Sequence, residues 1–114
     1  MKYMLLMYWE ESEMPKTPEE TQAAPRAWAA FRQEANAAGV LVSSGGLPAA
    51  NATTVRIRNG KSLITDGPFA ETHEQLGGYF LIECQNLDDA IRWAEKIPGA
   101  KHGAIEIRPL WTPE

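Results

Sequence analysis

The stretch that decides the fold is Gly78–Cys84, with the sequence GYFLIEC. Positions 79–82 are four consecutive large apolar side chains, whereas a strand with one solvated face alternates apolar and polar residues. We therefore predict a strand that is buried on both faces and lies in the middle of a sheet. The range 3–9, YMLLMYW, has the same character and predicts a second central strand.

Helices are expected on the outer side of these two strands. Thr17, Pro18 and Glu20 provide a cap, a first helical residue and a capping box, and an apolar stripe then runs to a stop at Gly39. Pro25 lies inside this helix and leaves open whether its continuous part begins only there. A second helix is predicted over 86–97, with acidic residues in its first turn, where the helix dipole favours them.

The remaining apolar segments predict edge strands and a hairpin. Ranges 40–47 and 103–110 are typical of edge strands, and Asn59-Gly60 is a strong turn signal between strands 53–57 and 61–65. The order is strand, helix, strand, hairpin, strand, helix, strand. We predict an α+β fold, a ferredoxin-like βαββαβ arrangement with an inserted β-hairpin.

This arrangement has a consequence for assembly. Two helices cover one face of such a sheet, yet both predicted central strands are apolar on both faces. We therefore expect a homodimer packed sheet to sheet, because a large open apolar face is unusual on a monomer. The alternative is that loop 10–16, the hairpin and Trp111 cover this face within one chain.

Composition limits the class of protein. A chain of 114 residues predicts a single domain over 1–114, and a net charge of −4 argues against nucleic acid as the main partner. The single cysteine, Cys84, excludes an internal disulfide and fits a reducing compartment. The apolar run at 3–9 is far shorter than the roughly 20 residues of a membrane span, and it lacks a signal-peptide cleavage site. We expect a cytoplasmic protein with no membrane partner.

The turn that begins Asp66-Gly67-Pro68 is the main functional candidate, because Gly and Pro fit poorly in helices and central strands. Asp66 is a candidate general base or acid, but an Asx turn that holds this connector explains the same residue. Phe69 is expected to anchor the turn by inserting into the core. His73 is a candidate partner for Asp66, and a solvated histidine in a surface turn is the simpler interpretation.

No cofactor or metal site is predicted. Two histidines and one cysteine lack close ligand spacing, and the dinucleotide pattern G-x-G-x-x-G is absent. We interpret Cys84 as a small core residue and not as a nucleophile. The paired glycines at 45–46 and 77–78 predict bulges or close backbone approach, which can border a ligand pocket.

The segments Asp66–Thr72, Leu76–Tyr79 and Ile105–Leu110 together resemble the DGPF, or YCII-related, family of bacterial proteins. The resemblance implies a dimeric α+β barrel. Smaller members carry a histidine–aspartate pair proposed as an active site, and its aspartate corresponds to Asp66. The first helix here has no histidine, and His73, seven residues after Asp66, is our candidate for the other half of the pair.

The resemblance also bears on activity, since one relative is a dehydrochlorinase in chloroaromatic breakdown. We predict a cofactor-free enzyme that acts on a small, aromatic molecule by proton transfer or elimination through Asp66. Two other classes stay open, namely a dimer that binds or senses a small ligand without turnover and a protein-interaction module associated with transcription regulation. The last is suggested only by the family's genomic neighbours.

Overall fold

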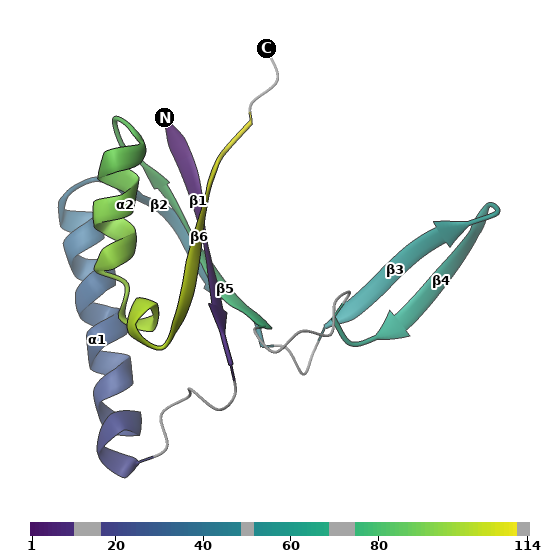
Figure 1. Ribbon diagram of the computed structural model, residues 1–114, viewed down its shortest axis with the longest axis horizontal. Coiled ribbons are helices and arrows are strands. Elements are labelled where there is room, and N and C mark those ends of the chain that lie inside the picture. Colours follow the sequence, from purple (N-terminus) through teal and green to yellow (C-terminus); the bar gives the residue numbers. More distant parts are fainter. Residues whose placement is uncertain (11–16, 49–51, 69–74, 112–114) are drawn as a thin grey trace.

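The computed structural model (Figure 1) describes residues 1–10, 17–48, 52–68 and 75–111. Its main sheet is antiparallel and has the strand order β2-β5-β1-β6. These strands are β1 (Lys2–Trp9), β2 (Leu41–Gly46), β5 (Gln75–Glu83) and β6 (Gly103–Pro109). The two strands predicted to be central, β1 and β5, are the inner pair, and the two predicted edges lie outside them.

Two α-helices, α1 (Pro18–Ala37) and α2 (Leu87–Glu95), pack on one side of this sheet (Figure 1). The side chain of Asn86 caps α2 by accepting a hydrogen bond of 3.0 Å from the backbone N–H of Asp89. A short 3₁₀ helix, η3 (Pro98–Lys101), leads from α2 into β6. The fold is therefore the predicted α+β, ferredoxin-like one.

Helix α1 is continuous through Pro25 and does not begin there. Proline lacks an N–H, so the helix loses the hydrogen bond that residue 25 would donate to the carbonyl of residue 21. The strong start signals at Thr17 and Pro18 are followed by helix on both sides of Pro25.

The hydrophobic core lies between the helices and the sheet. Odd-numbered residues of β1 and even-numbered residues of β5 point into it, as the antiparallel register between these strands requires. Phe31 and Phe80 pack edge to face, with their ring centroids 4.8 Å apart. The buried members are Tyr3, Leu5, Met7, Phe31, Ala35, Phe80, Ile82, Ala90, Ala94 and Ile97.

Strand β5 begins at Gln75, three residues before the predicted start, and it contains a bulge. The register against β1 shifts between Met7 and Tyr8, which leaves Gly77 as the extra residue. A Cβ atom at Gly77 would lie 2.0 Å from the indole ring of Trp9, and one at Gly78 would lie 2.5 Å from Cε of Met7. The predicted bulge and close approach at this glycine pair are confirmed.

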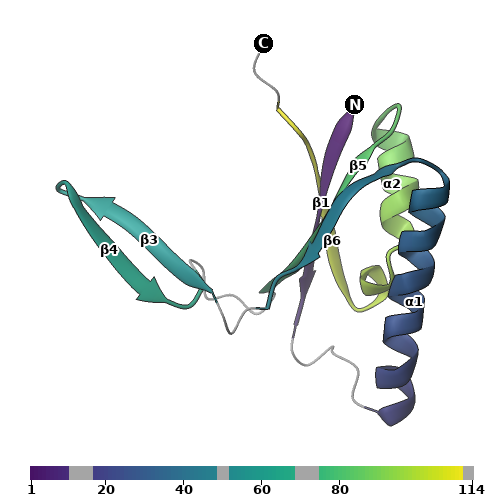
Figure 2. The same ribbon diagram turned by 180° about the vertical axis from the view of Figure 1, so that it is seen from behind.

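The inserted hairpin consists of β3 (Thr53–Arg58) and β4 (Lys61–Asp66), which form a two-stranded sheet of their own. The turn residues Asn59 and Gly60 have φ angles of 52° and 76°, as the Asn-Gly turn predicts. In Figures 1 and 2 the hairpin projects away from the main sheet on the side opposite the helices. The φ angles of Asn59 and Gly60 show that the hairpin turn was predicted correctly.

The face of the main sheet that lies opposite the helices is called the open face here. Its central side chains are half-buried, and they are Met4 and Leu6 of β1 with Tyr79 and Leu81 of β5. Trp111 does not cover this face, because 81% of its surface is exposed. Within the described residues, no helix is both long and apolar enough to cross a membrane.

Candidate functional site

Asp66 is the last residue of β4, directly opposite Thr53 of β3. Its side chain is exposed in the single chain. Because side chains alternate along a strand, Asp66 lies on the same hairpin face as Ile64 and its cross-strand partner Val55. A carboxylate therefore stands beside two apolar side chains at the base of the hairpin.

The backbone beyond Asp66 is held by two hydrogen bonds that do not use the carboxylate. The N–H of Gly67 donates to the carbonyl of Ala52 at 2.7 Å, and Oγ1 of Thr54 donates to the carbonyl of Gly67 at 2.8 Å. Gly67 has a φ of 110°, a conformation that favours glycine. The start of the turn is therefore fixed by its backbone and by Thr54.

These contacts bear on the structural interpretation of Asp66. An Asx turn closes on the N–H of the second following residue, and here that residue is Pro68, which has none. Among the described residues, no hydrogen bond or ion pair reaches the Asp66 carboxylate. Within this part of the chain the carboxylate is free for chemistry.

His73 and Phe69 lie outside the described residues. The pairing of Asp66 with His73 therefore stays a prediction, as does the insertion of Phe69 into the core. In the described ranges, no three acidic, histidine or cysteine residues come together as possible metal ligands.

A polar cluster on the open face was missed by sequence reasoning. The Oε1 atom of Glu106 accepts a hydrogen bond of 3.4 Å from Oη of Tyr8. The same atom forms an ion pair with Nε of Arg108, at 3.0 Å. Glu106 pairs with Leu6 in the register of β1 and β6, so the cluster borders the apolar centre of the open face. The strict alternation in β6 placed Glu106 and Arg108 on one face, but only the register shows which β1 residues they meet.

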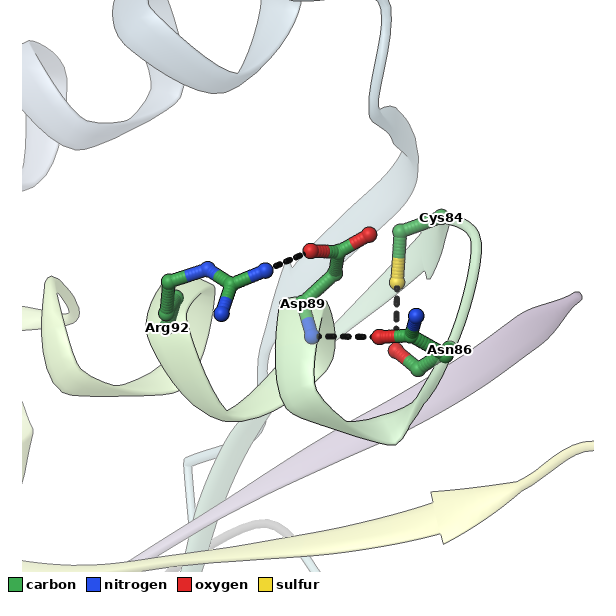
Figure 3. A network of polar contacts seen from close by, with 4 residues as sticks. All are labelled: Cys84, Asn86, Asp89 and Arg92. Atoms are coloured by element: carbon green, nitrogen blue, oxygen red, sulfur yellow. Dashed lines mark hydrogen bonds and ion pairs between the residues drawn. The ribbon is translucent and has the colours of Figure 1, made fainter.

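Cys84 does not have the surroundings of a nucleophile (Figure 3). Its thiol is half-buried and lies 3.6 Å from the carbonyl oxygen of Asn86. Burial raises the pKa of the Cys84 thiol, and the negative charge of Asp89 raises it further. Asp89 is itself paired with Arg92. Because the thiolate is the reactive form, this environment lowers reactivity.

We expect iodoacetamide to alkylate Cys84 more slowly than it alkylates a free thiol such as glutathione at pH 7.5. A raised pKa means that the Cys84 thiolate forms only at higher pH. The alkylation rate of Cys84 should therefore still increase at pH values above the pKa of the glutathione thiol. Mass spectrometry over a pH series measures both rates, and urea-unfolded protein is the control. Equal rates in folded and unfolded protein would contradict the role of burial.

Comparisons with protein families, with known proteins and with solved structures each found a similar one. The YCII-related domain profile matches residues 1–113. An uncharacterised protein from Rhizobium meliloti (strain 1021) is 38% identical over 114 residues, covering 96% of this chain and 92% of that one. Among solved structures, the fold is similar to that of 5-chloro-2-hydroxyhydroquinone dehydrochlorinase (TftG) from Burkholderia phenoliruptrix AC1100, in complex with 2,5-dihydroxybenzoquinone. The TM-score is 0.52, with 13% identity over 99% of this chain and 96% of that one.

Proposed function

The chain belongs to the YCII-related family, and we propose that it is a cofactor-free enzyme acting on a small aromatic molecule by proton transfer or elimination. Asp66 is the proposed proton acceptor, and His73 is its proposed partner. The observation that carries the proposal is the Asp66 carboxylate itself. The backbone directly after it is held by the hydrogen bonds of Gly67 and Thr54, and no described group uses the carboxylate for structure.

A carboxylate in this setting suits the loss of hydrogen chloride from a chlorinated hydroxyaromatic compound. In the keto tautomer of such a compound, the proton of one ring hydroxyl group has moved to the carbon that carries chlorine, and that hydroxyl has become a carbonyl. Asp66 then takes the proton of a second ring hydroxyl group, the electron pair of that O–H bond forms the second carbonyl, and a ring double bond shifts towards the carbon that carries chlorine. Chloride then leaves with the electron pair of the C–Cl bond. The ring is oxidised by the departure of chloride, so the step needs no external oxidant or redox cofactor.

The similar solved structure adds support of a limited kind. It shows that this fold can hold a dehydrochlorinase with a quinone bound. At 13% identity the likeness concerns the fold, so the substrate class enters here as a proposal for this chain.

The test of this function is a screen of the wild-type protein against chlorinated hydroquinones and hydroxyquinols, with unchlorinated analogues as controls. A chloride electrode measures release, and absorbance follows the ring. Turnover of a chlorinated compound supports the proposal. Saturable binding without turnover would indicate a ligand-binding dimer, and no binding at all would favour an interaction module.

We also propose that the protein is a cytoplasmic homodimer packed through the open face. Met4, Leu6 and Leu81 form the apolar centre of that face, and α1 and α2 lie on the other side. The hairpin projects away from this sheet, and Trp111, which might also have covered the face within one chain, is largely exposed. A partner sheet would cover these side chains.

Light scattering at micromolar concentration is expected to give a mass of two chains, about twice the 12.6 kDa of one chain. The reason is that a monomer would leave the apolar open face in water. A dilution series checks that the mass follows a monomer–dimer equilibrium. A mass of one chain throughout this range would refute sheet-to-sheet packing.

A further inference from the structure

The two faces of the β3–β4 hairpin differ sharply in chemistry. One face, called the apolar hairpin face here, carries Val55, Ile57 and Ile64, whose exposed fractions are 60%, 59% and 67%. The opposite face carries three basic side chains, Arg56, Arg58 and Lys61, together with Leu63. No described part of the same chain covers the apolar hairpin face.

A hairpin of this kind is not stable by itself. An isolated two-stranded hairpin is marginal in water, and it becomes stable by packing its apolar face on another surface. The hairpin is joined to the rest of the fold through segments 47–52 and 67–74, and its strands pair only with each other. Since no described part of the same chain covers this face, another molecule is the favoured source of the covering surface.

The accessible area of the whole chain is larger than that of a compact monomer. The solvent-accessible area is 8336 Å², whereas a compact monomer of 12.6 kDa exposes about 6,200 Å². The radius of gyration is 16.1 Å, against about 13 Å for a compact domain of this length. The excess of about 2,100 Å² lies within the about 1,000–2,500 Å² that each chain buries in an obligate homodimer.

Charge favours a second copy of the chain as the partner. The hairpin carries three basic residues and Asp66, so its net charge is +2. Because the whole chain has a charge of −4, the remainder carries −6. These net charges favour the approach of a hairpin from one copy to the body of another copy, and they oppose the approach of two hairpins, although the basic side chains lie on the face that points away from the proposed contact.

The position of the hairpin favours the same partner. It projects on the side of the open face, where the second copy lies in the proposed sheet-to-sheet dimer (Figures 1 and 2). Reaching past the sheet, it can extend along the body of that copy. The hairpin contact would then continue the sheet contact as one interface.

We propose that the apolar hairpin face packs against the body of the second copy and that this contact completes the Asp66 site. Asp66 lies on the same face as Val55 and Ile64, so a partner that covers this face also removes water from one side of the carboxylate. The proposal rests on the proposed homodimer, and it makes the site dependent on two chains.

Two adjacent residues of β4 provide a matched test. Ile64→Lys introduces a charge on the apolar hairpin face, and Leu63→Lys introduces the same charge on the basic face. Both side chains are largely exposed in the single chain, at 67% and 50%, so neither change should prevent folding. We expect Ile64→Lys to raise the dimer dissociation constant at least about tenfold and Leu63→Lys to change it less than about threefold.

Sedimentation equilibrium measures the dissociation constants, and amide hydrogen exchange at residues 53–66 reports whether the hairpin is covered. Protection of these amides should decrease on dilution of the wild type and in Ile64→Lys, but not in Leu63→Lys. Equal effects of the two variants, or hairpin amides that exchange equally fast in dimer and monomer, would overturn the proposal. Neither measurement uses turnover. The hairpin contact can therefore be refuted while the catalytic role of Asp66 stands, and the catalytic role can be refuted while the hairpin contact stands.

Discussion

Replacement of Asp66 by asparagine is expected to lower the turnover rate by about 10²–10⁴-fold, the usual contribution of a residue that transfers a proton. Asparagine has nearly the same shape but cannot accept a proton at neutral pH. The fold should be retained, because the contacts that hold this turn belong to Gly67, Ala52 and Thr54. Initial rates on a chlorinated substrate found by screening, together with circular dichroism, measure both quantities.

The matched control for this variant is Asp88→Asn. Asp88 is an exposed aspartate in the first turn of α2, so the same chemical change there should leave turnover unchanged and alter stability by less than about 1 kcal/mol. Full activity of Asp66→Asn would show that Asp66 is a turn residue, and the proposed enzyme would lose its proton acceptor. A loss of activity accompanied by unfolding would instead assign the carboxylate to structure.

Replacement of Phe80 by alanine is expected to lower the free energy of unfolding by about 3–5 kcal/mol. The ring is buried on the helix side of β5, 4.8 Å from the ring of Phe31 and 6.1 Å from that of Trp28, measured between centroids. Its removal leaves a cavity between the sheet and α1. Native domains are stable by only about 5–15 kcal/mol, so the loss is a large fraction of the total.

Urea unfolding at one fixed protein concentration measures this loss, since a dimer's stability depends on concentration. Leu87→Ala is the control, because Leu87 is exposed at the start of α2 and its truncation should change stability by less than about 1 kcal/mol. If the two variants unfold at the same urea concentration, the ring of Phe80 does not contribute to the core as described.

The topology could be predicted from sequence because each element carries a local signal. Two-sided apolar runs identified β1 and β5 as inner strands, and Asn59-Gly60 identified the hairpin. The start of β5 was predicted too late, because Gln75 and Leu76 pair with β1 across a bulge at Gly77. The bulge lets the residues that precede the glycine pair continue the pairing with β1. Whether such a bulge forms depends on the partner strand and not on the local sequence.

The site was predicted less completely, for a physical reason. The Asp-Gly-Pro sequence identified Asp66, and the missing N–H of Pro68 was already visible in it. The contact of Glu106 with Tyr8 depends on the register between strands almost a hundred residues apart, which local patterns do not contain. Likewise, the alternation in 53–57 and 61–65 shows two chemically different faces, but it does not show that the hairpin stands apart from the main sheet.

The arrangement of the tryptophans gives the protein internal optical probes. Trp9, Trp28 and Trp93 belong to one chain of ring contacts through Phe31 and Phe80, and Trp111 is exposed beyond the end of β6. The edge-to-face rings of Trp9 and Trp28, 6.5 Å apart, form a fixed asymmetric pair of chromophores. Ellipticity near 290 nm therefore reports the packing between the sheet and the helices. Quenching of Trp111 fluorescence by iodide reports solvent access just beyond the C-terminal end of β6.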